Sequence, residues 1–227
     1  MRNNERKYYH LRAISLEQRH KDFLVGTLLG DGCLAKGGKK SDFRLSFSHC
    51  EKQKDYFLWK FDFLKPFTNN FYKSIDKRGN SIMYQTKSIC HPELNKYAKM
   101  FYDSSRRKII PKDIESLLTP LGLAIWIMDD GNLNEKVNLR ICSMGFNYSE
   151  HHILQKALKN KFGIDCIIRE YKYKSKLYYM LWFDKVNTIK FSNLIKNHIV
   201  ESMKYKIVEP SETSCETPEM DEDKVRT

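Results

Sequence analysis

Two aspartates, Asp31 and Asp130, have the type and the surroundings needed for metal chemistry. Each ends an uncharged, largely apolar run and is followed by glycine, a pattern typical of a buried helix that stops at a left-handed glycine cap. The carbonyl end of a helix carries partial negative charge, so a carboxylate there calls for a positive partner. If the two helix ends lie side by side, we expect the carboxylates to hold divalent cations.

The two runs resemble each other, and other landmarks recur with them. The runs are Leu24-Val-Gly-Thr-Leu-Leu-Gly-Asp-Gly32 and Leu123-Ala-Ile-Trp-Ile-Met-Asp-Asp-Gly131. The recurring landmarks, offset by 98 or 99 residues, are Asp31 and Asp130, Glu51 and Glu150, and the segments Lys108-Ile-Ile-Pro111 and Lys206-Ile-Val-Glu-Pro210. Several landmarks at one offset indicate an internal duplication. We expect one lobe at 1–117, a second at 118–208, and an acidic disordered tail at 209–227.

The paired runs are similar to the twin signature of the LAGLIDADG homing endonucleases, in the type that carries both motifs on one chain. The second run, extended to Leu118-Thr-Pro-Leu-Gly-Leu-Ala-Ile-Trp-Ile-Met-Asp-Asp-Gly131, carries the resemblance most clearly, and the likeness covers about Leu16 to Pro210. The resemblance implies an α+β fold of two pseudo-symmetric αββαββα lobes with saddle-shaped antiparallel sheets. It also implies a nuclease that leaves short three-prime overhangs.

The resemblance assigns roles to particular residues. Asp31 and Asp130 would each hold a metal ion near one scissile phosphate, with the backbone carbonyls of Gly30 and Asp129 as further oxygen ligands. Mg²⁺ suits such a site because it takes hard oxygen ligands and keeps bound waters. Lys108 and Lys206 fall at the family's active-site lysine positions, where a cation can polarise the attacking water or stabilise phosphate charge.

Alternating residues predict the sheets. In 43–49, Phe43, Leu45 and Phe47 alternate with polar residues, the period of a strand with one apolar face. Arg78-Gly-Asn80 predicts a hairpin turn, and the same order of helices and strands returns in the second half. We expect the polar strand faces to read DNA in the major groove through Arg44, Ser46, Ser48, Lys73, Gln85, Lys87, Asn138, Arg140, Lys172 and Lys174.

Details of the signature helices can also be predicted. Ser15 is the expected N-cap of the first helix, with Gln18 completing a capping box. Gly26 and Gly30 lie four residues apart, so they share one helix face and leave room for a second helix. The corresponding residues of the second run are Ile125 and Asp129, which we expect to face these glycines across the contact.

Charge favours a phosphate-bearing partner. The chain carries a net charge of +12, and outside 209–227 it has 38 basic and 21 acidic residues, a net charge of +17. No apolar run reaches membrane-spanning length, and no targeting segment precedes the first helix. The six cysteines lack paired spacing and are expected to be free thiols.

The expected function is therefore a monomeric, Mg²⁺-dependent endonuclease for a long double-stranded DNA site, asymmetric because the two lobes differ at the DNA-facing positions. Two alternatives remain open: a maturase that binds the host intron RNA, and a non-catalytic DNA-binding regulator on the same scaffold. An organelle matrix, mitochondrial or plastid, or a microbial cytoplasm is the expected location.

Overall fold

The computed structural model describes residues 9–38, 41–68, 70–76 and 81–208, which form two lobes of the same design. The first lobe follows the order α2 (Gln18–Leu29), β1 (Cys33–Lys36), β2 (Phe43–Cys50), α3 (Lys54–Leu64), β3 (Phe71–Asp76), β4 (Ser81–Lys87) and α4 (Leu94–Phe101). The second follows α6 (Pro120–Asp130), β5 (Gly131–Asn134), β6 (Asn138–Ile141), α7 (Tyr148–Phe162), β7 (Ile167–Tyr173), β8 (Lys176–Trp182) and α8 (Lys185–Ile195). The predicted α+β fold with two αββαββα lobes is confirmed.

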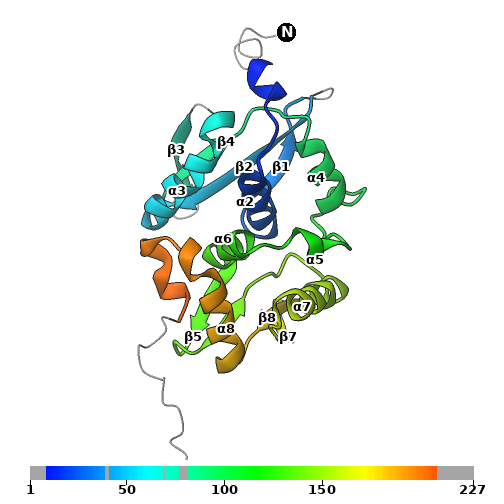
Figure 1. The fold of residues 1–227 in the computed structure, drawn as a ribbon, viewed down its shortest axis with the longest axis vertical. Helices are drawn as coiled ribbons and strands as arrows, with labels where there is room; N and C mark the ends of the chain where they lie inside the picture. The colour runs from blue at the N-terminus through cyan, green and yellow to red at the C-terminus, as the bar shows by residue number, and fades with distance from the viewer. Residues whose placement is uncertain (1–8, 39–40, 69, 77–80, 209–227) are drawn as a thin grey trace, which may run out of the picture.

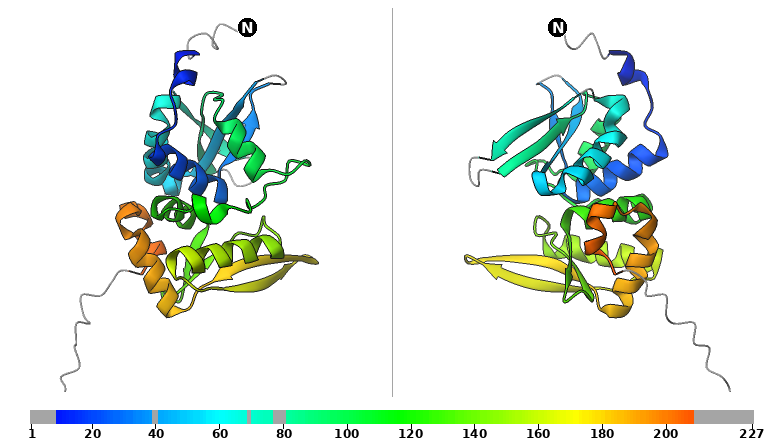
Figure 2. Two further views of the ribbon diagram at one scale, coloured as in Figure 1. Left: turned by 45° about the vertical axis from the view of Figure 1, so that its right-hand side comes forward. Right: turned by 90° about the vertical axis from the view of Figure 1, so that its left-hand side faces the viewer.

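Each lobe contains one four-stranded antiparallel sheet with the same strand order. The sheets run β1-β2-β4-β3 and β5-β6-β8-β7, so the hairpin strands β3 and β7 are edges. Helices pack against one face of each sheet, and the β3–β4 and β7–β8 hairpins project to the same side of the molecule (Figures 1 and 2). The opposite sheet faces therefore remain available on a common side.

The signature helices α2 and α6 lie side by side where the lobes meet (Figure 1). Their backbones approach so closely that a Cβ added at Gly26 would lie 2.3 Å from the carbonyl oxygen of Gly122. A Cβ at Gly30 would lie 2.4 Å from Oδ2 of Asp129. Thus Asp129 faces Gly30 as predicted, but Gly26 meets Gly122 rather than Ile125.

The ends of α2 and α6 differ from the predicted left-handed caps. The expected cap glycines were Gly32 and Gly131, and neither has a positive φ; the φ of Gly131 is −74°. Helix α2 instead ends at Gly30, with a φ of −95°. The reason is that each helix continues almost directly into a strand, and Gly131 itself begins β5, so extended backbone is required. At the other end, the N-cap of α2 is Glu17 in a capping box with His20, not Ser15.

Several short elements were not expected from the sequence. Strand β1 is one of them, and its Ala35 and Lys36 pair with Arg44 and Phe43 of β2. The remaining short elements are η1 (Tyr9–Ala13), η2 (Glu51–Gln53), η3 (Lys65–Phe67), α5 (Ile114–Leu117), η4 (Lys196–His198) and η5 (Glu201–Lys206). The predicted turn at Arg78-Gly-Asn80 and the tail at 209–227 lie outside the described residues.

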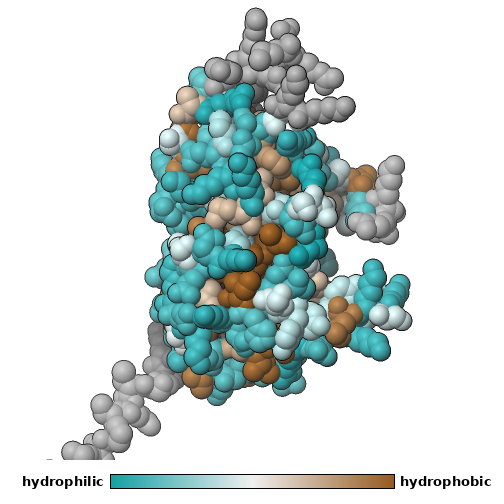
Figure 3. All heavy atoms as spheres, turned by 90° about the vertical axis from the view of Figure 1, so that its right-hand side faces the viewer, coloured by the Kyte–Doolittle hydropathy of each residue, from teal (hydrophilic) through white to brown (hydrophobic). Residues whose placement is uncertain are grey.

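Apolar side chains gather on the face of the molecule that carries α4, α5 and α7, at the level where the lobes meet (Figure 3). A cleft here is lined by Met100, Ile110, Pro111 and Ile153, and Arg107 lies at the same cleft. Among the described residues, no helix combines the length and hydropathy needed to cross a membrane.

Candidate active site between the signature helices

The carboxyl ends of α2 and α6 bring the two predicted acids into one site. Asp130 is the last residue of α6, whereas Asp31 is separated from the end of α2 by Gly30. The backbone N–H of Asp31 donates to Oδ2 of Asp129 at 3.0 Å, so the two acidic helix ends touch. The arrangement expected from the duplicated runs is present.

The two predicted acids sit in different surroundings. The Asp31 side chain is 50% exposed. Burial, followed by the charges of Asp129 and Asp31, raises the pKa of Asp130 to about 8. Burial and the charge of Asp129 also raise the pKa of Asp31. Asp31 and Asp130 therefore resist ionisation, and a bound cation would relieve that cost.

The predicted lysines lie directly on the two helix ends. The Lys108 Nζ donates to the carbonyl oxygens of Gly30 and Gly32, at 2.8 Å each. The Lys206 Nζ donates to the carbonyl oxygens of Met128 and Asp129, the latter at 3.2 Å. These ammonium groups satisfy carbonyls that the helices leave free and carry the charge that the helix ends favour. Burial lowers the pKa of both lysines, although the three aspartates oppose that shift.

The oxygen atoms at the two helix ends are ligands suited to a hard divalent cation. The available ligands are carboxylate oxygens of Asp31 and Asp130, the type that Mg²⁺ and Ca²⁺ take. The carbonyls of Gly30 and Asp129, predicted as further ligands, each accept a lysine ammonium in this structure. A metal on the same oxygen would repel that ammonium, so ligation by these carbonyls requires the lysines to move.

The side chain of Asp129 is enclosed by residues of the other lobe. Its carboxylate accepts a hydrogen bond from the Tyr56 hydroxyl at 2.7 Å and from the Lys60 ammonium at 2.9 and 3.0 Å. The side chains of Lys60 and Asp129 are 0% exposed. Although burial alone would raise the pKa of Asp129, Lys60 chiefly holds it below its usual value. This carboxylate is fully engaged within the protein and is not free to hold a metal.

His49, at the end of β2, completes the cluster. Its Nδ1 lies 3.8 Å from Oδ2 of Asp31 and its Nε2 lies 3.7 Å from Oδ1 of Asp129. Burial, followed by the charge of Lys60, lowers the pKa of His49 to about 4, so the ring is neutral near pH 7. Asp31, His49 and Asp129 could together surround an ion, but the Lys60 ammonium bound to Asp129 would repel it.

Sequence reasoning did not identify Tyr56, Lys60 or His49. All three belong to the first lobe, yet the group they surround belongs to the second, so no local pattern connects them. The one available signal was the mismatch between Gly30 and Asp129 at equivalent positions of the repeat, which shows that the two helix ends are not interchangeable.

In the first lobe, most of the predicted DNA-contacting residues share the open sheet face. Residues paired across neighbouring strands lie on the same side of a sheet. Ser46 pairs with Lys87, and Ser48 pairs with Gln85, which in turn pairs with Tyr72. Arg44 lies on this face too, because it alternates with the buried Leu45.

Lys73 was placed on this polar face incorrectly. It pairs with Tyr84, which is buried on the helix-covered side, and the Lys73 Nζ lies 5.0 Å from the centre of that ring. The strand register therefore gives the open face to Tyr72 and Ser74 instead. The cause is that no residue of β3 is buried, so the sequence does not indicate which residues of this strand face the helices.

In the second lobe, Asn138 and Arg140 lie on the open face, since they alternate with the buried Leu139 and Ile141. Lys174 occupies the tip of the β7–β8 hairpin, with Lys174 and Ser175 at φ of 44° and 63°, as in a two-residue type I′ turn.

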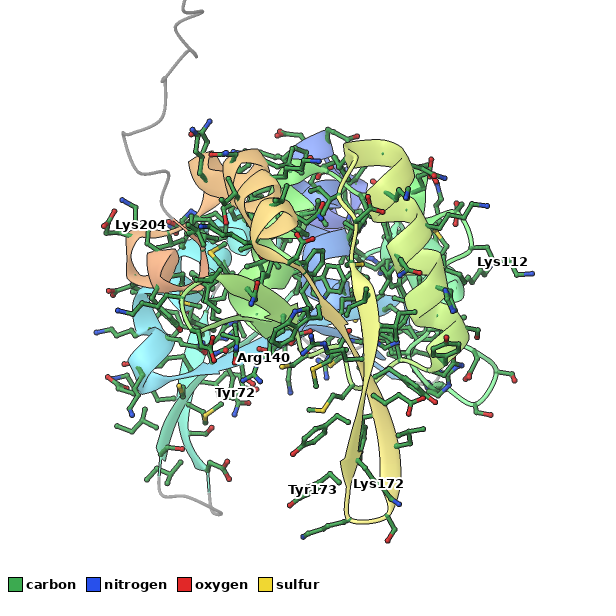
Figure 4. The ribbon with its side chains drawn as sticks, turned by 90° about the horizontal axis from the view of Figure 1, so that it is seen from below. Tyr72, Lys112, Arg140, Lys172, Tyr173 and Lys204 are labelled. Atoms are coloured by element: carbon green, nitrogen blue, oxygen red, sulfur yellow. The ribbon has the colours of Figure 1, made fainter. Side chains whose placement is uncertain are left out.

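Lys172 was also placed on the wrong face. It pairs with Leu177, two residues from Tyr179, whose ring lies 5.2 Å from that of Tyr148 on α7. Figure 4 shows Tyr173 pointing toward the β3–β4 hairpin and Lys172 pointing away from it. The residues that alternate onto the open face of β7 are Arg169, Tyr171 and Tyr173, none of which the sequence analysis selected.

Comparison with known proteins places this geometry in a family. A model described as "LAGLIDADG DNA endonuclease family" matches residues 21–191. The DNA endonuclease I-ChuI of Chlamydomonas applanata is 28% identical over 212 residues, covering 86% of this chain and 96% of that protein. The cytochrome b mRNA maturase bI2 of Saccharomyces cerevisiae is 28% identical over 198 residues, covering 81% of this chain and 46% of that protein.

Among solved structures, the homing endonuclease I-WcaI bound to its DNA recognition sequence aligns with a TM-score of 0.76 and 26% identity. The alignment covers 92% of this chain and 95% of I-WcaI. The fold and the paired acidic helix ends define the two-lobed homing endonuclease class. The chain belongs to the LAGLIDADG DNA endonuclease family.

Proposed function

We propose that this protein is a site-specific endonuclease that cuts both strands of a long, asymmetric DNA target, with Mg²⁺ as the divalent cation. The observation that carries the proposal is the meeting of Asp31 and Asp130 at the ends of α2 and α6, between two sheets whose open faces lie on one side of the molecule. One chain, with lobes at 1–117 and 118–208, supplies both halves of the site, so a monomer suffices.

The residues at the helix ends divide the chemistry. Asp31 and Asp130 would each hold a cation beside one scissile phosphate. A divalent ion bound there neutralises phosphate charge and makes a bound water more acidic. Lys108 and Lys206 reach the same helix ends and, once released from the backbone carbonyls, can stabilise the charge that develops on the phosphate.

Recognition of DNA is assigned to the open sheet faces. Seven predicted residues lie there, namely Arg44, Ser46, Ser48, Gln85, Lys87, Asn138 and Arg140, and Lys174 lies at a hairpin tip. The strand register places Tyr72 and Arg169 on the same open faces, so we add them to the DNA-contacting residues. The two faces differ in residue type, which supports an asymmetric target rather than a palindrome.

A second candidate function is that of an RNA-splicing maturase that binds its host intron RNA, and the similarity to the bI2 maturase favours it. A maturase has no need for paired acids and lysines at the helix ends, so their presence supports cleavage. We expect the protein to act where an intron-bearing genome resides, in an organelle matrix or a microbial cytoplasm.

The decisive experiment presents the full chain and Mg²⁺ with a large library of randomised DNA duplexes and sequences the cut products. A single long, non-palindromic site is expected, and Asp31→Asn and Asp130→Asn should each abolish double-strand cutting while retaining binding to it. If the wild-type protein binds duplexes but cuts none, the result favours a maturase or a non-catalytic DNA-binding regulator over an endonuclease. Affinity for the host intron RNA, compared with an unrelated RNA, would then separate these two.

A further inference from the structure

The two copies of the signature differ at one position that touches the opposite lobe. Gly30 in the first copy corresponds to Asp129 in the second. A side chain at residue 30 would collide with Asp129, because an added Cβ would lie 2.4 Å from its Oδ2. The space left by Gly30 is therefore filled by the Asp129 carboxylate, and the repeat is asymmetric at its centre.

The two metal-binding aspartates are supported by different means. Asp130 is part of α6, so the helix itself fixes its backbone. Asp31 lies beyond the end of α2, where Gly30 has already left helical geometry with φ −95° and ψ −131°. The N–H of Asp31 donates instead to Oδ2 of Asp129 in the second lobe, at 3.0 Å.

The Asp129 carboxylate, which accepts this hydrogen bond, also accepts hydrogen bonds from two residues of the first lobe. The Lys60 ammonium contacts both oxygens of Asp129, at 3.0 and 2.9 Å, and the Tyr56 hydroxyl contacts Oδ1 at 2.7 Å. The side chains of Lys60 and Asp129 are 0% exposed, so their geometry is fixed by packing as well as by charge. Two groups, through three hydrogen bonds, thus hold the Asp129 carboxylate with one oxygen at the backbone N–H of Asp31.

We propose that Asp129 is a positioning residue for Asp31, with Lys60 as its buried counter-ion, and that the two strand cuts consequently differ in their dependence on it. The inference rests on the proposed endonuclease function. The cut that uses Asp31 requires the side-chain oxygen of residue 129 that accepts from the Asp31 N–H, whereas the cut that uses Asp130 relies on helix α6. A purely structural ion pair would instead affect both cuts alike.

Two double variants separate positioning from stability, because substituting only one member of the buried pair would leave an unpaired charge and endanger folding. Lys60→Met with Asp129→Asn removes both charges but keeps an oxygen that can accept from the Asp31 N–H. Lys60→Met with Asp129→Leu removes both charges and that acceptor, with a side chain of similar branching. Thermal unfolding of both variants establishes that they are folded.

The first readout is made without metal and without cleavage, as amide hydrogen exchange at Asp31. Protection is expected to persist in the Asn double variant and to fall at least tenfold in the Leu double variant. The second readout is the rate of each strand cut on an end-labelled target duplex in Mg²⁺, with Asp31→Asn identifying the strand more dependent on that residue.

In the Leu double variant, that same strand should slow at least tenfold more than its partner, while the Asn double variant keeps the wild-type ratio within about twofold. Unchanged exchange at Asp31 in the Leu double variant, or equal slowing of both strands, would overturn the proposal. If the wild-type protein cuts no duplex, the proposed function fails, and the exchange measurement still decides whether Asp129 positions Asp31.

Discussion

The two aspartates occupy equivalent positions of a repeat, yet their surroundings give them different acidities. The Asp31 side chain is half exposed, whereas Asp130 has a pKa of about 8 because it is buried beside Asp129 and Asp31. In the metal-free protein this carboxyl ionises at a higher pH than an ordinary aspartate, and a cation bound beside it would favour its charged form. The repeat in sequence does not reveal this difference, since it depends on neighbours from the opposite helix.

The raised pKa of Asp130 predicts how metal-free stability changes with pH. Its folded pKa exceeds the unfolded value near 4, so ionisation opposes folding, and stability is lost as the pH rises from about 4 to about 8. Asp130→Asn removes this loss, so the variant should gain stability relative to wild type progressively across that range.

Urea unfolding in EDTA at several pH values measures this gain. Added Mg²⁺ should stabilise the wild type most near pH 8 and should thereby reduce the difference in stability between the wild type and Asp130→Asn. A difference between the two proteins that stays constant from pH 5 to pH 8 would contradict the assigned environment of Asp130.

The two lysines at the helix ends predict a second effect, on cleavage. Replacing both Lys108 and Lys206 by alanine removes the cations placed on the ends of α2 and α6. Cutting should slow by about 10²- to 10³-fold, the scale found when one preorganised electrostatic group is removed. Single-turnover rates measure this loss, and Lys156→Ala, on the exposed side of α7, is the control. Undiminished cutting by the double variant would refute the assigned role.

At the scale of elements, contact between α2 and α6 depends on Gly26. A methyl group there would lie 2.3 Å from the carbonyl oxygen of Gly122, which is backbone and cannot turn away. Gly26→Ala is therefore expected to destabilise the protein by about 3 kcal/mol or to force the helices apart. Equilibrium denaturation measures the change, with Gly145→Ala as the control because no atom lies within 4 Å of its added Cβ. Equal stability of the two variants would argue against the close backbone contact.

The elements themselves were largely predictable from sequence, because apolar periodicity reports which face is buried. The strand predicted at 43–49 is β2, Phe43–Cys50, and the order of helices and strands returns in the second half as predicted. Prediction failed where burial gives no signal. The edge strands β3 and β7 contain no buried residue, so the sequence did not indicate which of their residues face the helices, and Lys73 and Lys172 were assigned to the wrong face.

Only those residues of the candidate site that recur in both repeats were predictable from the sequence. The acids Asp31 and Asp130 and the lysines Lys108 and Lys206 recur at one offset, and the fold gathers them at the helix ends. The buried group around Asp129 does not recur. Tyr56 and Lys60 lie 73 and 69 residues from it, and only the packing of the two lobes brings them together.

At the scale of the whole molecule, the lobes are joined by polar as well as apolar contacts. Arg107 donates to both oxygens of Glu150, at 2.9 and 3.1 Å, and Glu150 is largely buried at the start of α7. Glu150 also accepts from the N–H of Asn147 as part of a capping box. The pair thus links the segment that carries Lys108 to the second lobe.

Removal of this link should weaken the whole protein. Arg107→Met is expected to cost about 2 kcal/mol, since it deprives a buried carboxylate of two charged hydrogen bonds. Chemical denaturation measures the cost, and the matched control is Lys65→Met, which breaks an ion pair that is exposed on both sides. A cost for Arg107→Met no greater than for the control would show that the link contributes nothing to stability.

The central proposal for the whole molecule is that the ends of α2 and α6 hold divalent ions over a single stretch of duplex. Crystals of the protein with its selected target and Mn²⁺, measured at the manganese absorption edge, locate those ions directly. We predict anomalous peaks within about 2.5 Å of the carboxylate oxygens of Asp31 and Asp130, beside the scissile phosphates. Peaks bound elsewhere, or DNA lying away from the open sheet faces, would contradict the account.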